Sequence, residues 1–448
     1  MPRPNRRLQH LRSMRLWLAP GMKVKRFVSV TVVSTLTLVV GVIAGVLWVL
    51  EGNRQSLSTP IETVLVSNTW NLYGGWISIA MVLLGLGFAI QSIAWLNRSL
   101  LSNWMHSPRD AASVLHKRLS LSRGPKIVAI GGGTGLSNLL RGLRQYSSNI
   151  TAVVTVSDDG GSSGRLRDAF DMPAPGDLTD CLAALSDNES EVSRLLEYRF
   201  KRGKELEGHT FGNLLITTLT EVEGDFAQAV RTMNALLNLT GRVYPITPEA
   251  VSLHVEKVSG KRVHGESRVR DVNGAISKVM IDPSQPRPTP EVISAFLEAD
   301  IIVLGPGSLF TSTIPPLLVP AARHAIRSSK AELIYISNIM TEAGETDNFS
   351  AFDHVEAIYK HLGRYPEHVL VNQTKVDEAR LERYYAEGAD VVTIDREAFA
   401  KAGIRLTALP LLSAGRHAQH DSNLLAQWLS DHAKQVATSP QRKDLIAV

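Results

Sequence analysis

A glycine-rich segment, Gly-Gly-Gly-Thr-Gly at residues 131–135, is the first part of this 448-residue sequence whose composition could do chemistry. It follows a short apolar run at 126–130 and precedes a helical pattern from Leu136 to about Tyr146. Residues without a Cβ atom let backbone N–H groups approach phosphate oxygens, and the N-terminus of the following helix adds the positive end of its dipole. The segment therefore predicts a phosphate-binding turn, with a tight turn that binds no ligand as the alternative. The predicted site residues are Gly131, Gly132, Gly133, Thr134 and Gly135.

Two familiar nucleotide motifs do not fit this segment. The dinucleotide fingerprint needs a third glycine or alanine where Leu136 stands, and a Walker A loop would continue with Gly-Lys-Ser/Thr. The single cysteine, Cys181, lies in a helical pattern and is predicted to be a core residue. One cysteine rules out a disulfide within the chain and every cysteine-based metal cluster. The histidines show no metal-ligand spacing, so no firm metal site is expected from them.

A second loop, Ser-Asp-Asp-Gly-Gly at residues 157–161, begins where the β-branched run 151–156 ends. In a doubly wound sheet that strand end lies beside the first glycine-rich turn, where ribose or base is recognised. Either aspartate could accept hydrogen bonds from ribose or base, or hold Mg²⁺ together with a diphosphate. The alternative is an Asx-rich surface turn that caps a helix. The predicted site residues are Asp158, Asp159, Gly160 and Gly161.

Further polar loops follow other strand-like or helical runs. Residues 305–312 read Gly-Pro-Gly-Ser-Leu-Phe-Thr-Ser after the strand-like run 301–304, which suits contact with phosphate or hydroxyl groups. In the loop 208–213, His209 could act as a general acid or base, bind a phosphate, or only hold its own loop together. The turn 340–346 follows another strand-like run. These loops are expected to meet at one sheet edge, with Gly305, Gly307, Ser308 and Asn213 as binding residues.

Strand-like and helical patterns alternate from Lys126 onward. The alternation predicts an α/β fold, with a Rossmann-like, mostly parallel sheet and helices on both faces, in a domain at 126–430. Residues 251–282 consist of short alternating segments with glycine between them, which favours a small antiparallel β insertion. Residues 431–448 are predicted to be a loose tail. The strand-like runs are 126–130, 151–156, 301–304, 333–337, 368–371 and 391–394.

Two uncharged apolar runs precede this domain, at 27–50 and 76–96. A helix of about 20 residues crosses the hydrocarbon of a bilayer, so the runs predict a transmembrane hairpin with an external loop at 51–75. A cleaved signal peptide followed by one buried core helix is the alternative. Residues 1–26 carry eight basic groups and no acid, and the linker 97–125 is also basic. The positive-inside rule then places both termini and the large domain on the cytoplasmic side of a cell membrane.

The distribution of charge argues against a nucleic-acid partner. The whole chain has a formal net charge of +5 and a pI of about 9.2. The basic excess belongs to the N-terminal 126 residues, and everything from Ile127 onward is acidic on balance. A basic footprint across the globular domain is therefore absent.

Several motifs together resemble the bacterial gluconeogenesis factor family, whose fold is similar to that of 2-phospho-L-lactate transferase. The resemblance covers about residues 125–430 and leaves out the two apolar runs. The segments that carry it occur in the same order here and are Ile130–Leu136, Asp158–Arg167, Pro175–Asp177, Gly208–Leu214, Gly305–Leu309 and Gly344–Thr346.

The resemblance implies a Rossmann-like domain that binds a UDP-sugar, notably UDP-N-acetylglucosamine. It implies a regulatory role that joins carbon metabolism, supply of peptidoglycan precursors and cell shape, without an established reaction. A family tyrosine that contacts the nucleotide sugar best matches Tyr384, with Tyr385 one residue away. A family arginine falls near Gln419, with Arg416 close by, so Tyr384 and Arg416 are the expected sugar-binding residues.

Three functions follow as hypotheses. The first is a membrane-tethered nucleotide-sugar sensor. The second is an Mg²⁺-dependent transferase that moves a phosphate-bearing group from a nucleotide diphosphate donor to a hydroxyl acceptor, with Asp158, Asp159 and His209 as candidate catalytic residues. The third is a membrane scaffold for wall-synthesis proteins in which nucleotide binding is only a switch. A regulatory protein partner and homo-oligomerisation stay open in each.

Overall fold

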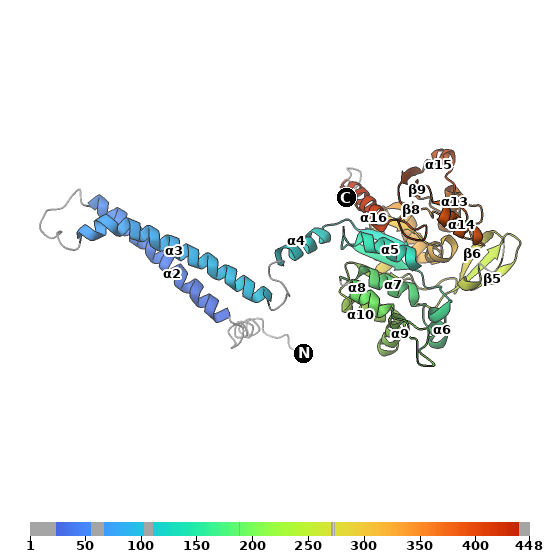
Figure 1. Cartoon of the computed structure of the whole chain (residues 1–448), viewed down its shortest axis with the longest axis horizontal. Helices are drawn as coiled ribbons and strands as arrows, with labels where there is room; N and C mark the ends of the chain where they lie inside the picture. Colours follow the sequence, from blue (N-terminus) through green and yellow to red (C-terminus); the bar gives the residue numbers. More distant parts are fainter. Residues whose placement is uncertain are drawn as a thin grey trace. The chain divides into compact units, whose positions relative to one another are not determined.

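The computed structural model describes residues 24–54, 67–102, 111–187, 189–269, 272 and 274–438. The chain divides into two compact units, Met1–Lys117 and Arg118–Val448, which are treated separately below. The first unit holds two long helices, and the second holds the α/β domain (Figure 1).

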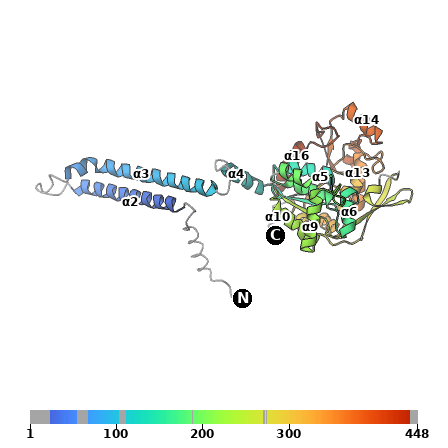
Figure 2. The same ribbon diagram turned by 60° about the horizontal axis from the view of Figure 1, so that its bottom comes forward.

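The first unit is a helical hairpin. Helices α2 (Val24–Arg54) and α3 (Ser67–Ser102) lie side by side in both views (Figures 1 and 2) and extend past the predicted spans. Their apolar windows, Ser29–Leu50 and Leu72–Leu96, are long enough to cross a membrane, and only 11% and 17% of each window is buried. The second run is therefore not the buried core helix of the alternative interpretation.

Small and polar residues hold the two helices together. A Cβ atom at Gly85 would lie 2.8 Å from the backbone nitrogen of Leu38, so the helices approach closely there. The Thr31 and Ser92 hydroxyls are 2.9 Å apart, and Ser34 and Ser78 are buried. The outward faces carry exposed Val, Leu, Ile and Trp side chains. Small residues inside and apolar residues outside are typical of helix pairs that pack within lipid.

The second unit is built on a seven-stranded, all-parallel sheet in the order β10-β9-β8-β7-β1-β2-β3. Ile127 of β1 is in register with Ile150 of β2 and with Ile301 of β7. The chain first runs outward from β1 to β3 and then outward from β7 to β10. The strands are β1 (Ile127–Gly131), β2 (Ile150–Val154), β3 (Arg242–Pro245), β7 (Ile301–Leu304), β8 (Glu332–Ile336), β9 (His368–Asn372) and β10 (Arg405–Leu409).

Both faces of the sheet are covered, which explains why its central strands β1, β2 and β7 are almost entirely apolar. One face packs mainly on α5 (Gly133–Leu143), α7 (Gly176–Leu185), α10 (Phe226–Leu236) and α16 (Ser422–Thr438). The other packs on α11 (Pro290–Glu298), α12 (Pro320–Ser328), α13 (Ala351–Leu362) and α15 (Arg396–Ala402). The other helices among the described residues are α4 (Ala111–Ser122), α6 (Gly161–Phe170), α8 (Glu189–Leu196), α9 (Phe211–Glu223), α14 (Glu378–Ala386), and the short η2 (Glu266–Arg268), η3 (Leu309–Thr313) and η4 (Pro315–Leu318).

The predicted insertion is confirmed as a separate three-stranded antiparallel sheet in the order β5-β4-β6. Its strands are β4 (Ser252–Lys257), β5 (Arg262–His264) and β6 (Ile276–Asp282). Its inward side chains, such as Val255 and Val279, join the core on the α11–α13 face of the main sheet. The predicted fold class, a mostly parallel sheet with this insertion and two apolar N-terminal helices, is therefore confirmed.

Some predicted boundaries are wrong. Within the described residues, the run 391–394 makes only isolated bridges, from Val391 to Met340 and from Thr393 to Ser350, so it is not a strand of either sheet. The tail predicted from residue 431 is helical as far as Thr438, where α16 buries Leu429 and Ala433 against the sheet face. Residues 439–448, like 1–23 and 55–66, lie outside the described residues.

Candidate functional site

The sheet reverses its direction of winding between β1 and β7. In a doubly wound sheet, the loops that leave two such strands diverge and form a crevice at their carboxyl ends. Here the loops are the predicted glycine-rich segments, 131–135 after β1 and 305–308 after β7. A Cβ atom at Gly135 would lie 2.3 Å from the carbonyl oxygen of Pro306, so only glycine allows this approach. Gly305 has a φ of 77°, a conformation that also favours glycine.

A pocket of about 220 Å³ occupies this crevice, and we call it the switch-point pocket. The N-terminal half of α5 contributes Gly135 and Asn138 to its wall, and the loop after β7 contributes residues 306–308. Residues 338–342, which follow β8, and residues 418–420, which precede α16, close the other sides. Tyr384 of α14 also lines the pocket.

Tyr384 and His420 are fixed by hydrogen bonds to backbone atoms. The Tyr384 hydroxyl accepts a hydrogen bond of 3.1 Å from the backbone N–H of Ala418. His420 Nε2 lies 3.2 Å from the carbonyl oxygen of Ser337, which can only accept, so this nitrogen carries the proton. Burial lowers the pKa of His420 to about 4, so the ring is neutral at physiological pH and leaves Nδ1 as an acceptor.

The loop after β8 connects the switch-point pocket to the β insertion. The Ser308 hydroxyl lies 2.9 Å from a carboxylate oxygen of Glu342 and 2.7 Å from one of Glu345. The ammonium group of Lys257, a buried side chain of β4, donates to the carbonyl oxygen of Gly344. Burial lowers the pKa of Lys257, although Glu345 acts in the opposite direction. The insertion thus supports one wall of the pocket.

A second pocket, of about 540 Å³, lies on the other side of the first glycine-rich turn, and we call it the acidic pocket. Thr134 lines it, whereas the next residue, Gly135, lines the switch-point pocket, so the turn separates the two. The wall includes the start of α6 at residues 160–163 and several charged side chains. These are Asp158, Asp177, Asp180, Arg141, Glu197 and Arg199.

Three carboxyl groups of the acidic pocket, those of Asp158, Asp177 and Asp180, have raised pKa values. Burial, reinforced by Asp158 and Asp180, raises the pKa of Asp177 to about 7. Burial, reinforced by Glu197, raises the pKa of Asp180 to about 6. The pKa of Asp158 is also raised, mainly by burial. Clustered carboxyls with raised pKa values are typical of sites where a bound cation or a proton transfer later changes the charge.

Asp177 also explains one glycine of the first turn. Its carboxylate accepts a hydrogen bond from the backbone N–H of Gly133, at the N-terminus of α5. A Cβ atom at Gly132 would lie 2.2 Å from Asp177 Oδ2. The Asp177 carboxylate leaves no room for a Cβ atom at residue 132, which explains Gly132. The backbone N–H of Gly133 already donates a hydrogen bond to the same carboxylate.

The two predicted aspartates have different roles in the structure. Asp158 lines the acidic pocket and accepts a hydrogen bond of 2.8 Å from the backbone N–H of Gly160. Asp159 accepts one of 2.8 Å from the backbone N–H of Ser267, in the insertion. A Cβ atom at Gly265 would lie 2.0 Å from Asp159 Oδ2. Asp159 thus holds the insertion against the α6 loop.

His209 and Asn213 form a network at the base of the acidic pocket. His209 Nδ1 lies 2.8 Å from the Ser162 hydroxyl, and Asn213 Nδ2 donates to the same hydroxyl at 3.2 Å. Residues 160–164, Gly-Gly-Ser-Ser-Gly, have the spacing of a nucleophile elbow around Ser162. However, Arg165 donates to His209 Nε2, where an orienting carboxylate would be expected, and burial and Arg165 lower the pKa of His209. The pair is not arranged to activate a serine nucleophile.

The other predicted residues are spread more widely. Gly307, Ser308 and Gln419 line the switch-point pocket, and Gly161 and Asn213 line the acidic pocket. Arg416 is exposed and uses its carbonyl oxygen to accept from Arg383, while the Tyr385 side chain is 52% exposed. Cys181 is fully buried in the core, where burial raises the pKa of its thiol.

Sequence reasoning missed several residues of both pockets. Asp177 was visible only as part of a Pro-Gly-Asp motif, and Asp180 follows it by one helical turn. Asn138 and Asn338 face the switch-point pocket but lie in unremarkable sequence. His420 could have been found as a polar residue just before a helix, had α16 been predicted.

An all-parallel, doubly wound sheet with a pocket at its switch point places the domain in the class of Rossmann-like α/β proteins. Within that class the chain belongs to the CofD family. The family model, described as 2-phospho-L-lactate transferase CofD, matches residues 127–412. The resemblance found in the sequence is thereby confirmed.

Named relatives agree with this assignment. A protein of Deinococcus radiodurans named "Putative gluconeogenesis factor" is 45% identical over 428 residues, which cover 94% of this chain and 90% of that protein. The gluconeogenesis factor of Bacillus subtilis is 41% identical over 317 residues, which cover 70% of this chain and 100% of that protein. A crystal structure of a UPF0052 family protein from Bacillus halodurans is similar with a TM-score of 0.66 and 39% identity, over 68% of this chain and 98% of that one.

Proposed function

We propose that this gluconeogenesis factor homologue is a membrane-tethered regulator that binds a UDP-sugar, UDP-N-acetylglucosamine in particular, on the cytoplasmic side. The observation that carries the proposal is the switch-point pocket, where an aromatic ring and glycine-rich turns meet at the edge of a doubly wound sheet. Rings stack on bases and sugars, and helix N-termini favour phosphate oxygens.

The dimensions of the site suit an extended ligand. The switch-point pocket alone, at about 220 Å³, is smaller than the ~300–1,000 Å³ usual for ligand pockets. The acidic pocket of about 540 Å³ lies directly across the turn, since Thr134 lines it and Gly135 lines the switch-point pocket. We infer that the nucleoside occupies the switch-point pocket and that the rest of the ligand extends across this turn. Mg²⁺ would offset the charge of the diphosphate near Asp158, since Mg²⁺ binds through one or two carboxylates plus phosphate oxygens.

The tether is supported by the first unit. Its helices are apolar on their outward faces and lie between basic segments. We propose a hairpin in the cell membrane with both termini in the cytoplasm. The described residues do not identify a protein partner or a surface for self-association. A regulatory role is compatible with either.

Calorimetric titration of the full chain in detergent tests the binding proposal. UDP-N-acetylglucosamine is expected to bind at micromolar concentration and more tightly than UDP or GDP, with Mg²⁺ strengthening the binding. Mass spectrometry of the mixture is expected to show no product. Absence of binding up to millimolar ligand would refute the proposal.

The acidic pocket favours a second candidate, a transferase that moves a phosphate-bearing group from a nucleotide diphosphate donor to a hydroxyl. This pocket contains more carboxyl groups than the binding of a ligand alone would require. Mg²⁺ held there would stabilise developing charge on phosphate oxygens. If the protein is such an enzyme, Asp158→Asn is expected to lower Mg²⁺-dependent release of the nucleotide product at least about 100-fold.

Asp168→Asn is the matched control for this measurement, because the Asp168 side chain is 78% exposed on α6 and lies outside both pockets. Equal turnover in the Asp158 and Asp168 variants would exclude a catalytic role for Asp158.

A further inference from the structure

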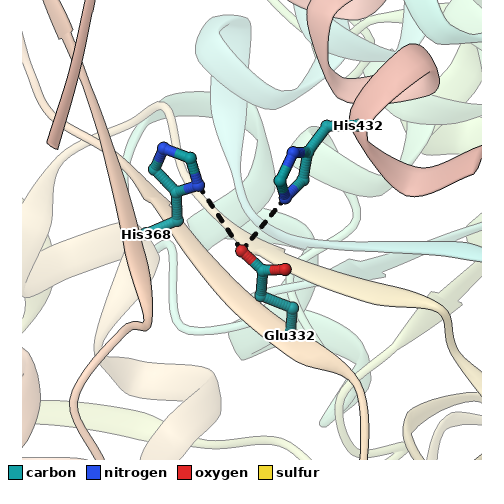
Figure 3. Close-up of side chains that lie close together, drawn as sticks. All are labelled: Glu332, His368 and His432. Atoms are coloured by element: carbon teal, nitrogen blue, oxygen red, sulfur yellow. Dashed lines mark hydrogen bonds and ion pairs between the residues drawn. The ribbon is translucent and has the colours of Figure 1, made fainter. Parts of the chain in front are cut away.

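Three side chains converge at the sheet edge opposite both pockets. Glu332 begins β8 and His368 begins β9, whereas the switch-point pocket lies beyond the other ends of the strands. His432 reaches them from α16, and all three side chains point toward one another (Figure 3). Neither the family's glycine-rich loops nor the proposed ligand involves this cluster.

The distances in the cluster match those between ligands of one metal ion. Glu332 Oε1 lies 3.0 Å from His432 Nε2 and 3.4 Å from His368 Nδ1. One ligand atom from each residue lies within 4.8 Å of the others. Two ligands of a tetrahedral zinc ion at bond lengths of about 2.0–2.1 Å are roughly 3.3 Å apart. Only small shifts would bring the three atoms around a common centre.

The surroundings of the histidines also suit coordination. His368 Nδ1 is buried and makes no hydrogen bond of good geometry, while its Nε2 lies 2.7 Å from the Thr407 hydroxyl. A hydrogen bond on the far ring nitrogen is the usual way in which a metal-binding histidine is oriented. The side chains of Glu332, His368 and His432 are 11%, 7% and 13% exposed, and Trp428 stacks on the His432 ring.

We propose that Glu332, His368 and His432 bind a zinc ion, with water in the fourth position. Two imidazoles and a carboxylate are a ligand set that zinc takes. The ion would join β8 and β9 to α16. Because the N-terminal end of α16 lines the switch-point pocket through Ser422 and Leu425, zinc would also fix one wall of that pocket.

Arg405 is the group that opposes a cation here. Its guanidinium lies 2.5 Å from Glu332 Oε1, and its positive charge lowers the site's affinity for a metal cation. The ion pair and both histidines hold the pKa of Glu332 well below its usual range, although burial acts against them. The Arg405 side chain is 58% exposed and can move aside, and the carboxylate has a second oxygen for it.

The test uses the full chain in detergent, stripped with a chelator and titrated with Zn²⁺ and with Co²⁺ as a spectroscopic probe. We expect one equivalent of tightly bound zinc and the intense visible absorption of tetrahedral Co²⁺. Glu332→Gln and His432→Gln are each expected to weaken zinc binding at least about tenfold. His324→Gln, at an exposed position on α12, is the matched control and is expected to change nothing.

A separate histidine pair must be distinguished from this site. His254 and His264 face each other across β4 and β5, with their Nδ1 atoms 2.5 Å apart. The tetrahedral Co²⁺ signal is expected to survive His254→Gln, and its loss there would overturn the assignment.

The variant Arg405→Gln distinguishes a metal site from a network of ion pairs that binds no metal. Removing the competing cation is expected to tighten zinc binding about threefold or more, since nearby like charge disfavours a cation. A purely structural network would give no gain. Unchanged affinity in this variant, or equal Co²⁺ binding by the wild-type chain and Glu332→Gln, would overturn the proposal. Circular dichroism of each apo variant checks that a lost signal does not reflect unfolding.

Discussion

Replacing Tyr384 by alanine is expected to weaken the binding of UDP-N-acetylglucosamine roughly 10–100-fold. The ring lines the switch-point pocket, and its hydroxyl accepts from the Ala418 N–H, which keeps it in place. Stacking of a base on an aromatic side chain contributes about 1–3 kcal/mol, and each 1.4 kcal/mol corresponds to about tenfold in affinity. Calorimetric titration of the full chain measures the change directly.

Two variants make this prediction specific. Tyr385→Ala is the matched control, because Tyr385 is the next residue on the same helix, and its exposed side chain does not line the pocket. Its affinity is expected to stay within twofold of wild type. Tyr384→Phe keeps the ring but loses the acceptor for Ala418 N–H, so it is expected to bind only slightly more weakly. If the Tyr384 and Tyr385 alanine variants bind equally well, the ligand does not lie in this pocket.

The fold was predictable wherever the sequence shows a strong period. The apolar strands β1, β2, β7 and β8, and the alternating strands of the insertion, were found because both kinds of strand leave simple patterns. The strands β3 and β10 were not, since each begins with an exposed arginine and mixes polar with apolar side chains. The end of α16 was missed because its apolar residues are widely spaced among polar ones.

The location of the site was more predictable than the roles of its residues. Strand ends followed by glycine-rich loops indicated the crevice, because parallel strands bring their carboxyl ends to one edge. What each residue contacts depends on partners distant in sequence. Asp159 pairs with Ser267, and Asp177 with Gly133, and no local pattern indicates either contact.

Stability of the α/β domain is expected to fall as the pH rises from about 4 to about 7, and Asp177 is the main reason. Its pKa is about 7 in the folded protein against an ordinary value of 3.8, so over this interval the folded state binds a proton that the unfolded state has lost. Stability decreases with pH wherever the folded state binds more protons. Each unit of pKa difference corresponds to about 1.4 kcal/mol, so the effect is on the order of 4 kcal/mol. Asp180 adds to it with a pKa of about 6.

Asp177→Asn removes the titrating group while keeping an oxygen that accepts from the Gly133 N–H. Calorimetric unfolding of the full chain in detergent is expected to show that the variant loses most of the decline between pH 4 and pH 7. Asp168→Asn, at the exposed position used above, is expected to keep the wild-type profile. Mg²⁺ is expected to raise the unfolding temperature of wild type more at pH 8 than at pH 5, since a cation binds the ionised carboxylates. A wild-type profile in the Asp177 variant would show that this carboxyl is already ionised well below pH 7, and the charge balance of the acidic pocket would then come from the arginines Arg141 and Arg199 that line it.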